Sequence, residues 1–175
     1  AQAELGHIPQ AAVDEIKAKA KFNVERILEI EAEVRHDVIA FLTNVNEYVG
    51  EAGRYIHLGM TSSDVLDTAL ALQMVASTNI LLTRLEETIQ AIRYQAQKHR
   101  NTVMIGRSHG IHAEPITFGF KLAGWLAEML RNRDRLVQVR RSIAVGKISG
   151  AVGTYANIEP RAEAIACQKL GLTPD

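Results

Sequence analysis

Residues 63–100 form a long run that contains neither glycine nor proline. Apolar side chains recur along this run at helical spacing, namely Val65, Ala69, Leu72, Ala76, Leu81, Leu82, Leu85, Ile89 and Ile92. At about 1.5 Å per residue, a helix of this length extends on the order of 55 Å, which is too long for a compact single-layer domain. Such a helix needs partners of similar length, so the run predicts a helical bundle.

The rest of the chain also has helical patterning. Apolar residues recur at helical spacing in four further segments, residues 13–20, 24–46, 118–145 and 159–170. Residues 102–117 and 146–154 are rich in glycine and are expected to be irregular loops, and no strand is predicted. Aromatic residues make up only 5% of the chain, whereas there are 23 alanines, a composition that favours closely packed helices over a β-sandwich. The expected fold class is all-α.

The charge balance and the cysteine content exclude several classes of protein. The 20 basic and 20 acidic side chains cancel, so the chain lacks the basic surplus of a nucleic-acid or membrane-surface binder. Cys167 is the only cysteine, which excludes an intrachain disulfide and a cysteine-based zinc site. Nothing resembles a signal peptide, and no 18-residue stretch is free of charge. A cytoplasmic protein without nucleic-acid or membrane partners is therefore expected.

The two ends of the sequence indicate a piece of a longer chain. Residues 1–6 have the pattern of a helix tail that is closed by Gly6, and there is no initiator methionine. The other end stops just after the short segment 159–170. A naturally short or processed protein is the alternative interpretation.

The first polar segment with side chains suited to binding or catalysis is HLGMTSSD, residues 57–64. Thr61 and Asp64 have the spacing of a capping box at the start of the long helix. A cap alone does not require three consecutive hydroxyl side chains preceded by His57. A helix N-terminus with clustered hydroxyls also suits a carboxylate or phosphate, so an anion-binding site is the second interpretation.

The second polar segment is GRSHGIHAEP, residues 106–115. Its two histidines, His109 and His112, are of the type that exchanges protons near neutral pH, as general acid–base chemistry requires. The same histidines with Glu114 are a possible metal-ligand set, although nothing in their spacing defines a ligand geometry. A structural loop whose histidines bond to backbone carbonyls remains a third interpretation.

The third polar segment, residues 35–37, falls inside the predicted helix 24–46. On a helical wheel His36 lies opposite the apolar stripe and shares its face with Glu25, Glu29 and Glu33. His36 is therefore not expected in the core. Taken alone, the segment is more simply interpreted as an ordinary solvated helix face, and a functional role is the alternative.

Together these segments resemble the adenylosuccinate lyase family, within the fumarase and aspartase superfamily. The resemblance rests on RHDVIAF at residues 35–41, HLGMTSSDV at 57–65, GRSHGIHAEP at 106–115 and SGAVGT at 149–154, in the family's order. The Thr-Ser pair is shared across the superfamily, whereas the run 110–115 is much narrower and points to adenylosuccinate lyase. What the resemblance implies is an enzyme without a cofactor or metal that eliminates fumarate from adenylosuccinate, giving AMP, and from the succinyl-carboxamide ribotide of purine synthesis.

The resemblance also implies roles for individual residues. His109 would be the general acid, and His36 and His57 would assist catalysis. The residues implied to contact the substrate are Arg35, His36, Asp37, Thr61, Ser62 and Ser108. Ser108 departs slightly from the family, where threonine is common, but it still supplies a hydroxyl.

The resemblance further implies how the chain is divided and what it lacks. Residues 1–60 would be the last part of an N-terminal helical domain, and residues 61–175 the first part of a central long-helix bundle. Family members are homotetramers whose sites combine residues from three subunits. The family's catalytic serine loop and its N-terminal Arg-Tyr pair have no counterpart here, so residues 1–175 alone are expected to be inactive. Another superfamily lyase, or a non-enzymatic helical assembly module with a histidine metal site, are the alternatives.

Overall fold

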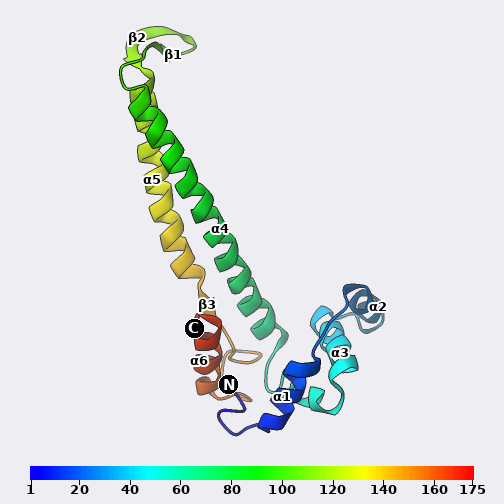
Figure 1. Ribbon diagram of the computed structural model, residues 1–175. Helices are drawn as coiled ribbons and strands as arrows, with labels where there is room; N and C mark the ends of the chain where they lie inside the picture. Colours follow the sequence, from blue (N-terminus) through cyan, green and yellow to red (C-terminus); the bar gives the residue numbers. More distant parts are fainter. The chain divides into compact units, whose positions relative to one another are not determined.

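The computed structural model describes residues 1–175 and confirms the expected all-α class (Figure 1). The six α-helices are α1 (Gln10–Lys19), α2 (Val24–Val34), α3 (Asp37–Val49), α4 (Ser62–Lys98), α5 (Phe118–Ile143) and α6 (Pro160–Leu170). A 3₁₀ helix, η1 (Gly50–Tyr55), follows α3. The four strands are short: β1 (Val103–Ser108), β2 (Ile111–Thr117), β3 (Val145–Gly146) and β4 (Thr173–Pro174).

The chain forms two compact units. The first comprises residues 1–70 and 145–175, and the second comprises residues 71–144. Helix α4 therefore starts in the first unit and continues into the second. The long glycine-free run predicted this helix correctly, because its bounds are within two residues of those expected.

The first unit contains two small apolar clusters. One joins α1, α3 and η1 through the buried residues Ala12, Val45, Val49 and Ala52. The other joins the segment after β3 to α6 through the buried residues Ile148, Ile158 and Ala162. The polar segments at residues 35–37 and 57–64 both belong to this unit.

The start of the chain is a hydrogen-bonded turn and not a helix, and Gly6 closes it as the sequence predicts. Gly6 has a φ of 76°, in the left-handed region that favours glycine. The N–H of His7 donates to the Gln2 carbonyl at 2.9 Å, and the N–H of Gly6 donates to the Ala3 carbonyl at 3.0 Å. This pair of bonds is a Schellman motif.

The predicted single helix 24–46 is wrong, since it is interrupted at two residues. Arg35 ends α2 in the left-handed conformation, with a φ of 56°, and His36 is extended and caps α3. His36 Nδ1 accepts a hydrogen bond from the Ile39 N–H at 3.4 Å. His36 is thus a capping residue and does not lie on a helix face. The apolar spacing continues on both sides of the break, so periodicity alone does not reveal it.

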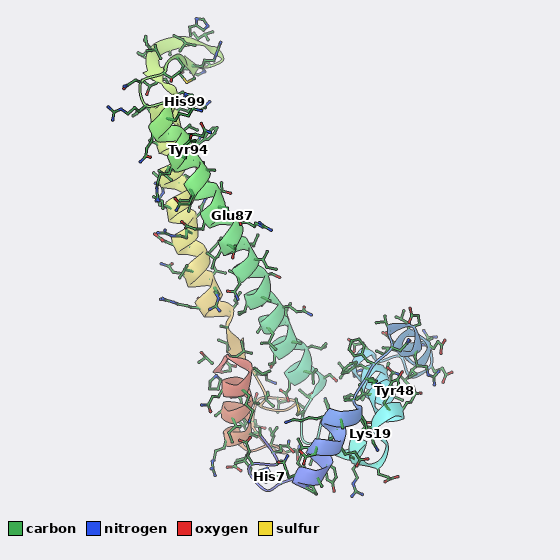
Figure 2. The ribbon with its side chains drawn as sticks, viewed as in Figure 1. His7, Lys19, Tyr48, Glu87, Tyr94 and His99 are labelled. Carbon is green, nitrogen blue, oxygen red and sulfur yellow. The ribbon has the colours of Figure 1, made fainter.

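In the second unit, α4 and α5 run side by side in opposite directions (Figure 1). Ile89 is fully buried between them, and Leu122 is nearly so. Arg140 Nε also donates to Asn79 Oδ1 at 2.5 Å. Near the end of α4, the His99 ring, labelled in Figure 2, packs edge-on against Phe118 at a centroid distance of 5.3 Å.

The expected irregular loop 102–117 is also wrong, because β1 and β2 form an antiparallel hairpin. Pro115 excludes a helix but is accepted in an edge strand, where it pairs with Ile105. His109 and Gly110 form the two-residue turn, with φ of 52° and 77°. Positive φ at both central residues is the geometry of a type I′ hairpin turn, which explains the glycine.

Several large apolar side chains of this unit remain exposed, including Ile80, Leu81, Tyr94, Phe120, Trp125 and Val139. By length and composition alone, α4 is apolar enough to cross a membrane, a test that core helices of soluble proteins also pass. Glu87 and Tyr94 lie along α4 in Figure 2. Two helices cannot cover one another on all sides, so much of this apolar surface has no partner within the chain.

Candidate active site

The start of α4 carries the cap that the Thr61–Asp64 spacing predicts. The Thr61 N–H donates to Asp64 Oδ2 at 2.9 Å, which is the carboxylate half of a capping box. No hydrogen bond joins the Thr61 or Ser62 hydroxyl to the N–H groups of α4. The cap therefore explains Asp64 and leaves both hydroxyls, which are half-buried, available for other partners.

His36 meets the start of α4. Its Nε2 lies 3.5 Å from Ser62 Oγ, so two of the polar segments singled out from the sequence come together in the first unit. The neutral tautomer with its proton on Nε2 serves both bonds of the ring, since Nδ1 then accepts from Ile39 N–H and Nε2 donates to Ser62. Protonation on Nδ1 would instead direct that nitrogen toward Asp37 Oδ1, 3.3 Å away.

Left-handed backbone is concentrated at the candidate residues. Four non-glycine residues have positive φ: Arg35, His57, His109 and Tyr155. This conformation costs about 1–2 kcal/mol for a residue with a Cβ, and such strain is concentrated at functional sites. The ring Nε2 of His57 is also buried without a hydrogen-bond partner. The first three of these residues are among the site residues expected from the sequence.

Asp64 has a second role that sequence reasoning missed. Its carboxylate is fully buried and binds the glycine-rich loop after β3. Oδ1 accepts from Lys147 Nζ at 2.8 Å and from the Ser149 N–H at 3.1 Å, and Oδ2 accepts from the Gly150 N–H at 3.1 Å. Burial opposes ionisation, but the Lys147 ammonium and the backbone donors outweigh it and hold the pKa of Asp64 below its usual value.

A second buried carboxylate, Glu163 of α6, holds the other side of this loop. Glu163 Oε2 accepts from the Ile148 N–H at 2.6 Å, and Oε1 accepts from the Tyr155 hydroxyl at 2.9 Å. The hydrogen bond to Glu163, together with burial, raises the pKa of Tyr155. An acidic residue in the first turn of a helix is ordinary in a sequence, so no local signal identifies Glu163 as a loop anchor.

The hairpin of the second unit carries Ser108 and His109. Both side chains are exposed, and His109 has no hydrogen-bond partner within the chain. The turn is stabilised by Arg107, whose Nη1 donates to the Gly110 carbonyl at 3.3 Å. His109, His112 and Glu114 do not come together as a metal-ligand group. The histidine metal site therefore has no three-ligand geometry in this hairpin.

The candidate residues thus divide between the two units. The first unit holds Arg35, His36, Asp37, His57, Thr61 and Ser62, and the second holds Ser108 and His109. Within the first unit, His36 and Ser62 are in contact, whereas the exposed side chain of Arg35 makes no hydrogen bond. The hydroxyls and the unbonded histidine nitrogens are groups that bind carboxylates and transfer protons.

Comparisons with known proteins agree with the resemblance found in the sequence. Residues 1–174 match the lyase family. The whole chain is 85% identical to adenylosuccinate lyase from Synechocystis sp., of which it spans 41%. It is 52% identical over 172 residues to adenylosuccinate lyase from Bacillus subtilis, of which it spans 40%. The chain therefore spans about two fifths of the length of these curated relatives.

Solved structures share the fold. The chain superimposes on 3-carboxy-cis,cis-muconate lactonizing enzyme from Pseudomonas putida with a TM-score of 0.92 at 31% identity, covering 99% of this chain and 42% of that one. It superimposes on fumarate lyase from Mesorhizobium sp. BNC1 with a TM-score of 0.88 at 33% identity, covering 99% and 42% of the two chains.

Proposed function

Since the chain belongs to the lyase family, we propose that the protein containing it is a carbon–nitrogen lyase that eliminates fumarate from adenylosuccinate to give AMP. The proposal includes the related cleavage of the succinyl-carboxamide ribotide in purine nucleotide biosynthesis. The observation that carries it is the 85% identity to an adenylosuccinate lyase over all 175 residues. The contact between His36 and Ser62 adds physical support, because it joins two of the resembling segments.

The elimination needs a base, an acid and the substrate carboxylate that takes up negative charge. A base removes a proton from the carbon next to a carboxylate, the negative charge spreads into that carboxylate, and an acid protonates the departing nitrogen as the carbon–nitrogen bond breaks. We assign the role of the acid to His109. Its ring is exposed and makes no hydrogen bond within the chain. A group in this role contributes typically about 10²–10⁴ in rate.

Binding of the succinyl group is assigned to the start of α4. Thr61 and Ser62 offer hydroxyls at a helix N-terminus, where the dipole favours a negative charge. His36 and His57 assist near this end. The other residues assigned to substrate contact are Arg35, Asp37 and Ser108.

The domain division and assembly proposed from the sequence remain part of this proposal. The boundary between the N-terminal domain and the long-helix bundle is placed near Thr61. The exposed apolar side chains of α4 and α5, such as Ile80 at 65% and Phe120 at 72% exposure, support covering by other copies in a homotetramer. Burial of α4 in such a bundle also accounts for its apolar composition in a cytoplasmic enzyme. Size measurement of the full-length protein tests the assembly.

The function is tested by fumarate release from adenylosuccinate, with the full-length wild-type protein, His109→Ala and His112→Ala. We expect His109→Ala to lower kcat by about 10²–10⁴ and leave the circular dichroism spectrum unchanged. His112→Ala, a change in the same hairpin, is the matched control and should retain most activity. Residues 1–175 alone should release no fumarate.

The outcomes separate the parts of the proposal. A wild-type protein that releases no fumarate would refute the substrate assignment. A His109→Ala variant with near-normal kcat would refute only the assignment of the acid.

A further inference from the structure

The buried carboxylate of Asp64 connects the start of α4 to a loop more than 80 residues later in the sequence, with Lys147 Nζ 2.8 Å from Oδ1 across a separation of 83 residues. On the α4 side it accepts from the Thr61 N–H at 2.9 Å. On the loop side it accepts from Lys147 Nζ and from the N–H groups of Ser149 and Gly150. One carboxylate thus fixes two backbone segments relative to one another.

Lys147 holds the same junction from the loop side. Its Nζ donates to Asp64 Oδ1 and, at 2.9 Å, to the Gly150 carbonyl. Its backbone is bound as well, because the Thr68 hydroxyl donates to the Lys147 carbonyl at 3.0 Å and lies 3.1 Å from the Lys147 nitrogen. Thr68 is one turn beyond Asp64 on α4, so Lys147 is attached to two successive turns of that helix.

Two parts of these segments take no part in the junction, namely the tip of the loop and the hydroxyls at the start of α4. The tip of the loop, residues 151–154, is exposed, and Val152 has 81% of its surface accessible. The hydroxyls of Thr61 and Ser62 take no part in the cap bond, which the Thr61 N–H donates. The base of the loop is therefore fixed by buried polar bonds, whereas the tip and the Thr61 and Ser62 hydroxyls take no part in these bonds.

We propose that Asp64 and Lys147 are positioning residues for the elimination, which hold the hydroxyl-bearing start of α4 and the loop 147–154 in the arrangement that binds the substrate. The inference rests on the proposed function of Thr61 and Ser62. Neither Asp64 nor Lys147 needs to touch the substrate in this role. A purely structural pair would stabilise the fold without affecting how strongly folded enzyme binds adenylosuccinate.

The kinetic test compares full-length wild-type protein with Lys147→Met, Lys147→Arg and Val49→Ala. Lys147→Met keeps an unbranched side chain of nearly the same length and leaves Asp64 its backbone donors, so the fold is expected to persist. Loss of the charged hydrogen bond should raise KM for adenylosuccinate about tenfold or more, with a smaller change in kcat, well below the melting temperature. Lys147→Arg restores a charged donor and should return KM toward the wild-type value.

Val49→Ala is the matched control, because Val49 is 1% exposed in the separate cluster of α1, α3 and η1. It should lower the melting temperature and leave KM unchanged. An unchanged KM in Lys147→Met would overturn the inference, as would an equal rise in Val49→Ala. Since all variants are compared with active wild-type protein, an inactive wild type would instead count against the proposed function.

A second measurement does not depend on activity. Amide hydrogen exchange followed by mass spectrometry on peptides covering residues 57–64 and 147–155 reports both sides of the junction. We expect exchange in both peptides to accelerate together in Lys147→Met, and in neither for Val49→Ala. Acceleration confined to the loop peptide would show that Lys147 does not hold the start of α4, and would overturn the inference.

Discussion

Replacing Gly59 with alanine tests how closely the segment before α4 is packed. Gly59 has a φ of 75° and lies in the turn in which the Met60 N–H donates to the His57 carbonyl at 3.1 Å. A Cβ at this position would overlap the carbonyl oxygen of Asn157 and would lie 3.6 Å from the Ile158 Cβ. Alanine at residue 59 is therefore destabilising for two reasons. Its backbone conformation is unfavourable, and its Cβ would overlap a backbone carbonyl.

The two costs can be separated. A left-handed conformation costs alanine about 1–2 kcal/mol relative to glycine. Displacing the neighbouring backbone adds about 1–3 kcal/mol, as in other overpacked sites, because Asn157 precedes the buried Ile158 and cannot move freely. We expect Gly59→Ala to lower the free energy of unfolding by about 2–5 kcal/mol in total.

Gly171→Ala isolates the conformational cost. Gly171 ends α6 with a φ of 70°, and a Cβ there would meet nothing within 4 Å. Gly171→Ala should lower the free energy of unfolding by only about 1–2 kcal/mol, which is the cost of the left-handed conformation. Thermal unfolding of the full-length protein, followed by circular dichroism, should therefore give a clearly lower midpoint for Gly59→Ala than for Gly171→Ala. Equal midpoints would refute the close packing of residue 59 against Asn157.

Two further experiments probe ionisable groups in the first unit. The pKa of Asp64 is lowered from 3.8, so its contribution to stability is present above that pH and is lost as the pH falls through the folded value. In Lys147→Met the Asp64 carboxylate stays buried but loses the ammonium that favours its charged form, so acid unfolding of the full-length protein should begin at a higher pH than in wild type. Acid unfolding of wild type and variant at the same pH would contradict this. Burial raises the pKa of the fully buried Cys167, whose Sγ is 3.5 Å from the Gly146 carbonyl, so a thiol reagent at neutral pH should label it only after unfolding. Rapid labelling of native protein would show that α6 is not packed as described.

Helices α4 and α5 could be predicted from the sequence because the interactions that define a helix are local. Apolar residues at helical spacing locate both helices to within two residues, and the run of α4 also lacks glycine and proline. The closing of the first turn at Gly6 is equally local. The polar segments that carry the resemblance to the adenylosuccinate lyase family are also visible in the sequence, since the resemblance depends on residue identity and order.

The break between α2 and α3 and the hairpin β1–β2 were not predicted. Histidine is not among the usual capping residues, so His36 gives no local signal for a helix start. The hairpin depends on pairing between strands, and Pro115 and the glycines favour a loop when they are considered one at a time.

The sequence by itself determined which residues carry hydroxyls, imidazoles and charges, and that long helices would present them. Only the tertiary structure decided what Asp64 and Glu163 do, because both bind groups contributed by another segment of the chain. A buried carboxylate is stable only where several donors converge on it, and the donors to Asp64 include residues 83, 85 and 86 positions away. Local patterns show that a charge is present, but the folded arrangement of distant segments determines where it can be buried and what it holds in place.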